Sequence, residues 1–127
     1  MHKHVILIVD DEKRVLFVLK NALSRLDDSL KVMTADTGQD ALGKMADERY
    51  DLVITDLIMP DMGGVELTRQ IRARENSPAV VWMTAYGCQS FMAEMEKLGV
   101  YRCIEKPVEI AQIRQVAREA LRQNETG

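Results

Sequence analysis

The alternation of five short apolar runs with segments of helical periodicity largely determines the class of fold open to this chain. The runs begin near residues 5, 31, 51, 79 and 102. The first, Val-Ile-Leu-Ile-Val over residues 5–9, is typical of a strand buried on both faces of a sheet. Between the runs, apolar residues recur as they do along one face of a helix. This alternation predicts a parallel sheet with right-handed crossovers and helices on both faces.

A second pattern is the kind of residue that directly follows the buried strands. These residues are acids after the first and third strands, a hydroxyl after the fourth and an amine after the fifth: Asp10 and Asp11, Asp56, Thr84 and Lys106. In an open parallel sheet, ligands bind beyond the carboxyl ends of the strands, near the point where the strand order reverses. We therefore expect the three acids, the hydroxyl and the amine to converge at one edge of the sheet.

Three carboxylates in one place require positive charge nearby. Two carboxylates about 4 Å apart repel by about 4 kcal/mol at an effective dielectric constant of about 20, so the cluster must bind a cation or take up protons. Lys106 supplies one positive charge, and Mg2+ suits carboxylate oxygens while keeping waters that a phosphate can displace. Together with a hydroxyl, these groups form a phosphoryl clamp in which a carboxylate attacks to give an aspartyl phosphate. Asp56 is the predicted nucleophile because it ends a central strand.

Length and charge narrow the function classes. A chain of 127 residues predicts one domain over residues 1–127, with a core within about 5–121. The 17 Lys and Arg face 20 Asp and Glu, a formal net charge of -3, so we expect no direct binding of nucleic acid or membrane by this domain. No apolar run approaches a membrane span of about 18 residues, and the first run is too short for a signal peptide. A cytoplasmic location is therefore expected.

The two cysteines, Cys88 and Cys103, have no metal-binding spacing and no neighbouring histidines. We interpret both as packing residues of a protein in a reducing compartment, with neither a zinc site nor a disulfide between them.

One ordered set of motifs resembles the receiver domain of two-component response regulators. The set comprises Asp10-Asp11 after an apolar strand, Asp56 followed by Leu57-Ile58-Met59-Pro60 and Gly64, Thr84-Ala85, and Lys106-Pro107. The resemblance extends from about Val5 to about Leu121. It implies a flavodoxin-like, doubly wound α/β fold with a five-stranded parallel sheet in the order 2-1-3-4-5 and five helices.

The resemblance also implies a role for each residue of the site. Asp56 would accept a phosphoryl group from a sensor histidine kinase or a phosphotransfer protein, and the domain would promote only its own phosphorylation and dephosphorylation rather than act as an enzyme. Asp11, Asp56 and the carbonyl of Ile58 would bind Mg2+, with Asp10 helping through a water. Thr84 would hydrogen-bond the phosphoryl group, Lys106 would pair with it, and the Lys106-Pro107 bond would be cis.

Partners follow from the same resemblance. The exposed side of the first helix is where the family meets its kinase, and Phe17 is either an apolar anchor there or a partly buried core residue. Phosphorylation would repack the face formed by the fourth helix, fifth strand and last helix, which an output domain or downstream protein would read. Homodimerisation on phosphorylation is a further expectation.

The sequence departs from the family pattern at a few positions. Cys103 stands where the family often has an aromatic residue that turns inward on activation, and Tyr101, expected on the same face of the strand, is a candidate substitute. Gly63 replaces a small polar residue at the start of the third helix, which predicts a looser turn. Ile58 and Tyr86 occupy the two variable positions that tune hydrolysis, and their bulk predicts a longer-lived acyl phosphate.

Two other functions combine some of the same features. A small phosphatase of the haloacid-dehalogenase type also uses an aspartyl nucleophile with Mg2+, but its nucleophile follows the first strand in an Asp-x-Asp signature, whereas Asp10 and Asp11 are adjacent. A flavodoxin-like cofactor binder needs a phosphate loop rich in Ser, Thr and Gly after the first strand, where this chain has acids that would repel FMN.

Overall fold

The computed structural model describes the chain from residue 4 to residue 126, with side chains described as far as Gln123. Its centre is a five-stranded sheet in the order β2-β1-β3-β4-β5, with every neighbouring pair parallel. The strands are β1 (His4–Val9), β2 (Leu30–Ala35), β3 (Leu52–Asp56), β4 (Ala79–Thr84) and β5 (Arg102–Glu105). The predicted α/β fold and strand order are therefore confirmed.

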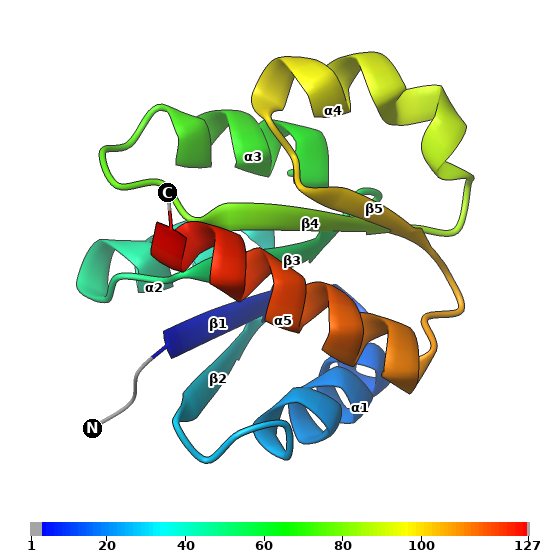
Figure 1. Cartoon of the computed structure of the whole chain (residues 1–127). Coiled ribbons are helices and arrows are strands. Elements are labelled where there is room, and N and C mark those ends of the chain that lie inside the picture. Colours follow the sequence, from blue (N-terminus) through cyan, green and yellow to red (C-terminus); the bar gives the residue numbers. More distant parts are fainter. Residues whose placement is uncertain (1–3, 127) are drawn as a thin grey trace.

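Helices cover both faces of the sheet (Figure 1). They are α1 (Lys13–Ser24), α2 (Gly38–Asp47), α3 (Gly64–Arg72), α4 (Met92–Leu98) and α5 (Ile110–Thr126), with a short 3-10 helix, η1 (Cys88–Phe91), directly before α4. Helices α1 and α5 pack on one face, and α2, α3 and α4 pack on the other. Within residues 4–126, no helix combines the length and apolar character needed to cross a bilayer.

Alternation along each strand divides the core into two clusters. On β1, Ile6 and Ile8 face α1 and α5, whereas Leu7 and Val9 face the opposite helices, and all four side chains are fully buried. Burial on both faces explains why the central strands read as continuous apolar runs. The carboxyl ends of β1 and β3, the two strands at which the chain order reverses, are thereby held side by side.

Local sequence signals explain where the helices begin and end. Thr37 caps α2 by accepting a hydrogen bond from the Asp40 N–H at 2.9 Å, and Gly99 ends α4 in the left-handed conformation with φ 62°. The last helix continues beyond the predicted core limit of Leu121 to Thr126, because no glycine or proline interrupts it before Gly127. Residues 1–3 and 127 of the predicted single domain lie outside the described part of the chain.

Candidate functional site

The three predicted acids meet at the carboxyl edge of the sheet. Asp10 follows β1 and is 0% exposed, Asp56 ends β3 and is 6% exposed, and Asp11 faces solvent at the entrance to α1. One carboxylate oxygen from each lies within 4.8 Å of the other two. The set therefore has a buried base and an open side from which a ligand can approach.

Lys106 links two of these acids across the sheet. Its Nζ donates to Asp10 Oδ2 at 2.8 Å and to Asp56 Oδ2 at 3.0 Å, and it lies 3.5 Å from Glu12 Oε1. Burial disfavours the ammonium, but the hydrogen bonds and charges of Asp10 and Asp56 outweigh it, so the pKa of Lys106 is raised. Lys106 is therefore a fixed positive charge held by carboxylates.

Asp10 is the most deeply buried acid of the cluster. Burial raises the pKa of Asp10, and the hydrogen bonds from Lys106 and from the Glu12 N–H, at 2.9 Å, oppose this only in part. A further positive charge would stabilise its ionised form. The cluster offers only carboxylate oxygens, and the exposed Asp11 leaves room for water. This is the set of ligands that Mg2+ prefers. The residues present therefore fit the predicted ion.

The turn after Asp56 is held tightly against the end of β3. The Ile58 N–H donates to Asp56 Oδ1 at 3.3 Å, and the Gly64 N–H donates to the Leu57 carbonyl at 2.9 Å. A Cβ on Gly64 would collide with the Asp56 carbonyl, and one on Gly63 would lie 2.7 Å from the Leu57 carbonyl. Glycine at both positions permits this close approach of backbone to backbone, and the looser turn expected from Gly63 stays a prediction.

A buried hydrogen-bond chain fixes α3 to the neighbouring strand. Trp82 Nε1 on β4 donates to Thr68 Oγ1 at 2.8 Å, and the Thr68 hydroxyl donates to the Gly64 carbonyl at 2.7 Å. Both side chains are 0% exposed. The start of α3, next to Asp56, is thus connected to β4.

Thr84 ends β4 and is buried at the same edge. Its hydroxyl accepts from the Tyr86 N–H at 3.0 Å, and its carbonyl accepts from the Lys106 N–H at 2.8 Å. Among the described residues, its hydroxyl makes no hydrogen bond to Asp56 or to Lys106 Nζ. Thr84 therefore lies at the predicted edge without contacting the predicted nucleophile through a hydrogen bond. The Lys106-Pro107 bond is cis, as the resemblance implied.

Two expectations about the residues in and around β5 are wrong. Cys88 and Cys103 form a disulfide although neither spacing nor context indicated one. Their Cα atoms come within 5.9 Å because η1 lies beside β5, a tertiary contact that sequence spacing does not reveal. Tyr101 does not share a face with Cys103: it precedes β5 and packs with the α1 and α5 cluster, whereas Cys103 packs with the opposite cluster.

Glu12 is a residue of the site that the sequence reasoning missed. Its carboxylate is the third acid around Lys106, although its side chain is 65% exposed. The signal that could have found it is its place directly after Asp10 and Asp11, at the entrance to α1.

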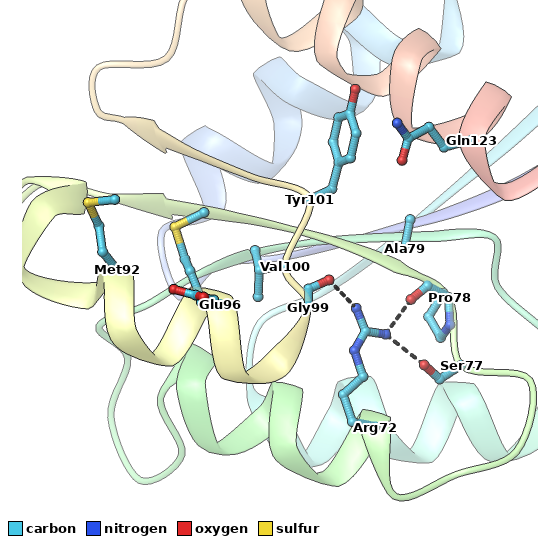
Figure 2. Close-up of a pocket in the computed structure, with 11 residues that line it drawn as sticks. Arg72, Ser77, Pro78, Ala79, Met92, Glu96, Gly99, Val100, Tyr101 and Gln123 are labelled. Carbon is cyan, nitrogen blue, oxygen red and sulfur yellow. Dashed lines mark hydrogen bonds between the residues drawn. The ribbon is translucent and has the colours of Figure 1, made fainter. Parts of the chain in front are cut away.

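Apart from the acid cluster, a hollow lies at the opposite, amino-terminal edge of the sheet (Figure 2). It has a volume of about 730 Å³ and lies between α3, the segment before β4, α4 and the segment before β5. Arg72 fills its base: its guanidinium donates to the carbonyls of Pro78 at 2.6 Å, Leu98 at 2.7 Å and Gly99 at 3.0 Å, and to Ser77 Oγ at 2.6 Å. Burial lowers the pKa of Arg72. These bonds join three segments, so this hollow has a structural role and the acid cluster is the better candidate site.

Comparisons with known proteins agree with the geometry. The family model described as the response regulator receiver domain matches residues 6–118. Sporulation initiation phosphotransferase F of Bacillus subtilis is 31% identical over 95% of this chain and 96% of its own length. Response regulator protein PilR of Pseudomonas aeruginosa is 32% identical over 96% of this chain, and the matched region spans only 27% of PilR.

Solved structures give the same result. A response regulator receiver domain protein, described as CheY-like, from Methanospirillum hungatei superposes with a TM-score of 0.88 at 27% identity, covering 97% of each chain. A receiver domain protein from Clostridium thermocellum gives a TM-score of 0.86 at 26% identity, over 97% of this chain and 98% of that one.

Proposed function

The chain belongs to the response regulator receiver family of two-component systems, and we propose that Asp56 is the residue on which it accepts a phosphoryl group. The observation that carries this proposal is Lys106, whose ammonium lies between Asp56 and Asp10 at the carboxyl edge of the sheet. A positive charge already placed beside the nucleophile can pair with the phosphoryl oxygens as they arrive.

In the proposed reaction, a carboxylate oxygen of Asp56 attacks the phosphorus of a phosphohistidine. An O–P bond forms, the N–P bond breaks, and its electron pair returns to the imidazole nitrogen. Lys106 pairs with the transferred group, and Thr84 hydrogen-bonds it once the segment after β4 has moved closer. The domain promotes only the addition and loss of its own phosphoryl group and turns over no other substrate.

Magnesium belongs to the same proposal. Asp10, Asp11, Asp56 and the carbonyl of Ile58 would hold the ion, with Asp10 acting through a water. When bound, Mg2+ would neutralise charge on the phosphoryl oxygens. The close approach of the Ile58 backbone to Asp56, and the three converging carboxylates, support this set of ligands.

The proposed donor is a sensor histidine kinase or a phosphotransfer protein that docks beside α1. Phe17 on this helix is 69% exposed, which favours an apolar anchor over a core residue. A hollow of about 510 Å³ lies between α1 and the segment after β5, lined mainly by Val15, Val18, Leu19, Pro107 and Val108. An apolar hollow next to the site gives a partner helix a surface from which its histidine can reach Asp56.

The readout is proposed to run through α4, β5 and α5. The phosphoryl dianion attracts Lys106 and Thr84, and their shift repacks this face for an output domain, a downstream protein or a second copy of the chain. The single domain over residues 1–127 and its cytoplasmic location, where an ATP-dependent kinase can act, are parts of the same proposal. With a net charge of -3, this domain is not expected to bind nucleic acid or membrane itself.

One experiment tests the assignment of Asp56. Incubation with Mg2+ and acetyl phosphate should give a stoichiometric adduct, stable in acid and labile in base, that mass spectrometry detects in the wild type and not in Asp56→Asn. The matched control is Asp61→Asn, which removes an acid from the adjacent turn and should leave the adduct intact. An adduct that persists in Asp56→Asn would overturn the proposal.

The haloacid-dehalogenase alternative is not favoured. Its nucleophile follows the first strand, whereas here that position is Asp10, which is 0% exposed and already hydrogen-bonded to Lys106 and the Glu12 N–H. Continuous release of phosphate from phosphate esters added to the same incubation would instead support the phosphatase alternative.

A further inference from the structure

The disulfide between Cys88 and Cys103 joins the start of η1 to β5. A second bond reinforces the same connection, since the Cys88 N–H donates to Glu105 Oε2 at 3.2 Å. Both cysteines are half-buried, so neither residue is fully enclosed by the protein. Exchange with a small thiol or a small disulfide therefore does not require exposure of a fully buried core residue.

The segment between Thr84 and Cys88 is held at both ends. At one end, Thr84 is the last residue of β4, and its carbonyl is bonded to the Lys106 N–H. At the other end, the disulfide fixes Cys88 to β5. Only Ala85, Tyr86 and Gly87 lie between the two attachments, and Gly87 has a positive φ of 81°. A closed loop this short has few conformations available, so Thr84 has little freedom to move towards Asp56.

We infer that Cys88 and Cys103 are a redox modification site that controls how freely the segment carrying Thr84 moves. The co-reactant on oxidation is a small disulfide: one thiolate attacks it to form a mixed disulfide and releases one small thiol. The second cysteine thiolate then attacks the mixed disulfide, closes the Cys88–Cys103 bond and releases a second small thiol. Two electrons pass from the cysteines to the small disulfide, and a dithiol reverses the reaction.

The position of the pair indicates what it regulates. Oxidation ties η1, and with it the start of α4, to β5, so that elements of the proposed readout face move together. Reduction leaves only the Glu105 hydrogen bond, which a small displacement can break. In the cytoplasmic compartment that the proposed function implies, disulfides are usually transient and redox-sensing, which suits a regulatory role better than a purely structural one. The effect on phosphorylation rests on the proposed function, whereas the modification itself does not.

The first test measures the modification. The wild-type chain is equilibrated with oxidised glutathione or with dithiothreitol and then alkylated, and its intact mass is measured by mass spectrometry. After reduction, we expect both thiols to be alkylated. After oxidation, we expect neither to be alkylated, no glutathione to be attached, and the mass to be lower by two hydrogens than that of the reduced chain before alkylation. Stable glutathione adducts at both cysteines, or disulfide-linked dimers in place of the internal bond, would overturn the inference.

The second test measures the mobility of the segment by hydrogen exchange of residues 84–92. Reduction should speed exchange there at least about threefold, because the closed loop opens, and should leave β1 unchanged. The Cys88→Ser variant cannot form the internal bond, so it should exchange at the reduced rate under both conditions. Equal exchange in oxidised and reduced wild type would contradict the inference, as would a redox difference that persists in Cys88→Ser.

The third test connects the pair to the site. The reduced wild type should react with acetyl phosphate and Mg2+ about threefold faster than the oxidised form, since Thr84 can then reach the phosphoryl group. Cys103→Ser, a second variant without the bond, should lose this redox dependence. Asp56→Asn separates the two proposals: it should abolish the adduct while keeping the redox difference in hydrogen exchange. Equal rates for the two redox forms of a phosphorylatable wild type would refute control of phosphorylation.

Discussion

The two edges of the sheet each hold one partly buried cation, and they hold it in opposite ways. At the carboxyl edge, Lys106 is 14% exposed and lies among the carboxylates of Asp10, Asp56 and Glu12. At the amino edge, Arg72 is surrounded by three carbonyls and a hydroxyl. The pKa of Lys106 is raised because nearby anions outweigh its burial, whereas burial lowers the pKa of Arg72.

The difference between these partners predicts different roles for the two cations, an exchangeable one for Lys106 and a structural one for Arg72. In the proposed reaction the carboxylates would exchange Lys106 for another cation, and Lys106 would exchange them for the phosphoryl group, because each exchange replaces one oppositely charged partner by another. Carbonyls offer Arg72 no such alternative, and its planar set of donors matches several acceptors at once. Arg72 should therefore affect stability with little effect on phosphorylation, whereas Lys106 should affect both.

The largest stability change is expected from Arg72→Met. Removal of the guanidinium leaves partly buried carbonyls without a donor, and the free energy of unfolding should fall by about 3 kcal/mol in urea denaturation. Arg72→Lys is the matched control and should recover part of the loss, since one ammonium cannot reach all four acceptors. Acetyl phosphate should still label the folded fraction of Arg72→Met at a rate within about twofold of wild type. A large drop in that rate would break the distinction between the two edges.

Lys106→Met should cost less stability, about 2 kcal/mol without Mg2+, although it removes a cation from two acids. The cost is limited because the open side of the cluster admits water and other cations. The double variant Asp10→Asn/Lys106→Met should recover most of the loss in the same denaturation experiment, because one of the repelling carboxylates is gone. If the double variant were less stable than Lys106→Met, repulsion among the acids would not be the cause.

Magnesium should stabilise the carboxyl edge alone. At ten times its dissociation constant, Mg2+ should add about 1.4 kcal/mol to the free energy of unfolding of the wild type, provided that the unfolded chain does not bind it. Asp11→Asn should lose most of this increment, and Arg72→Met should keep it in full. An equal increment in Asp11→Asn would place the ion elsewhere.

The smallest effect concerns the open side of the site. The side chains of Ile58 and Tyr86 are exposed, and the residues are 49% and 70% exposed; they lie two positions after Asp56 and Thr84, respectively. If these side chains restrict attacking water, Tyr86→Ala should speed loss of the phosphoryl group about threefold, equivalent to about 0.7 kcal/mol in the barrier. Met92→Ala, which trims another exposed apolar side chain away from the acids, is the control for the decay measurement. A Tyr86→Ala rate no faster than wild type would count against shielding.

The carboxyl edge could be predicted from sequence because it depends on order alone. Once strands and helices alternate, the residues that end the strands must meet at one edge, and Asp10, Asp56 and Lys106 do so. Contacts that depend on how a helix end lies against a strand were not predictable in the same way. Arg72 binds carbonyls, which every residue possesses, and Cys88 meets Cys103 only because η1 lies beside β5.

The buried indole next to the disulfide gives the domain a built-in optical label. Trp82 is the only tryptophan in the chain, is 0% exposed, and is the direct partner of Cys103 in the pairing of β4 with β5. Its indole N–H is bonded to Thr68, so the emission of this one side chain can follow the packing of α3 against the sheet.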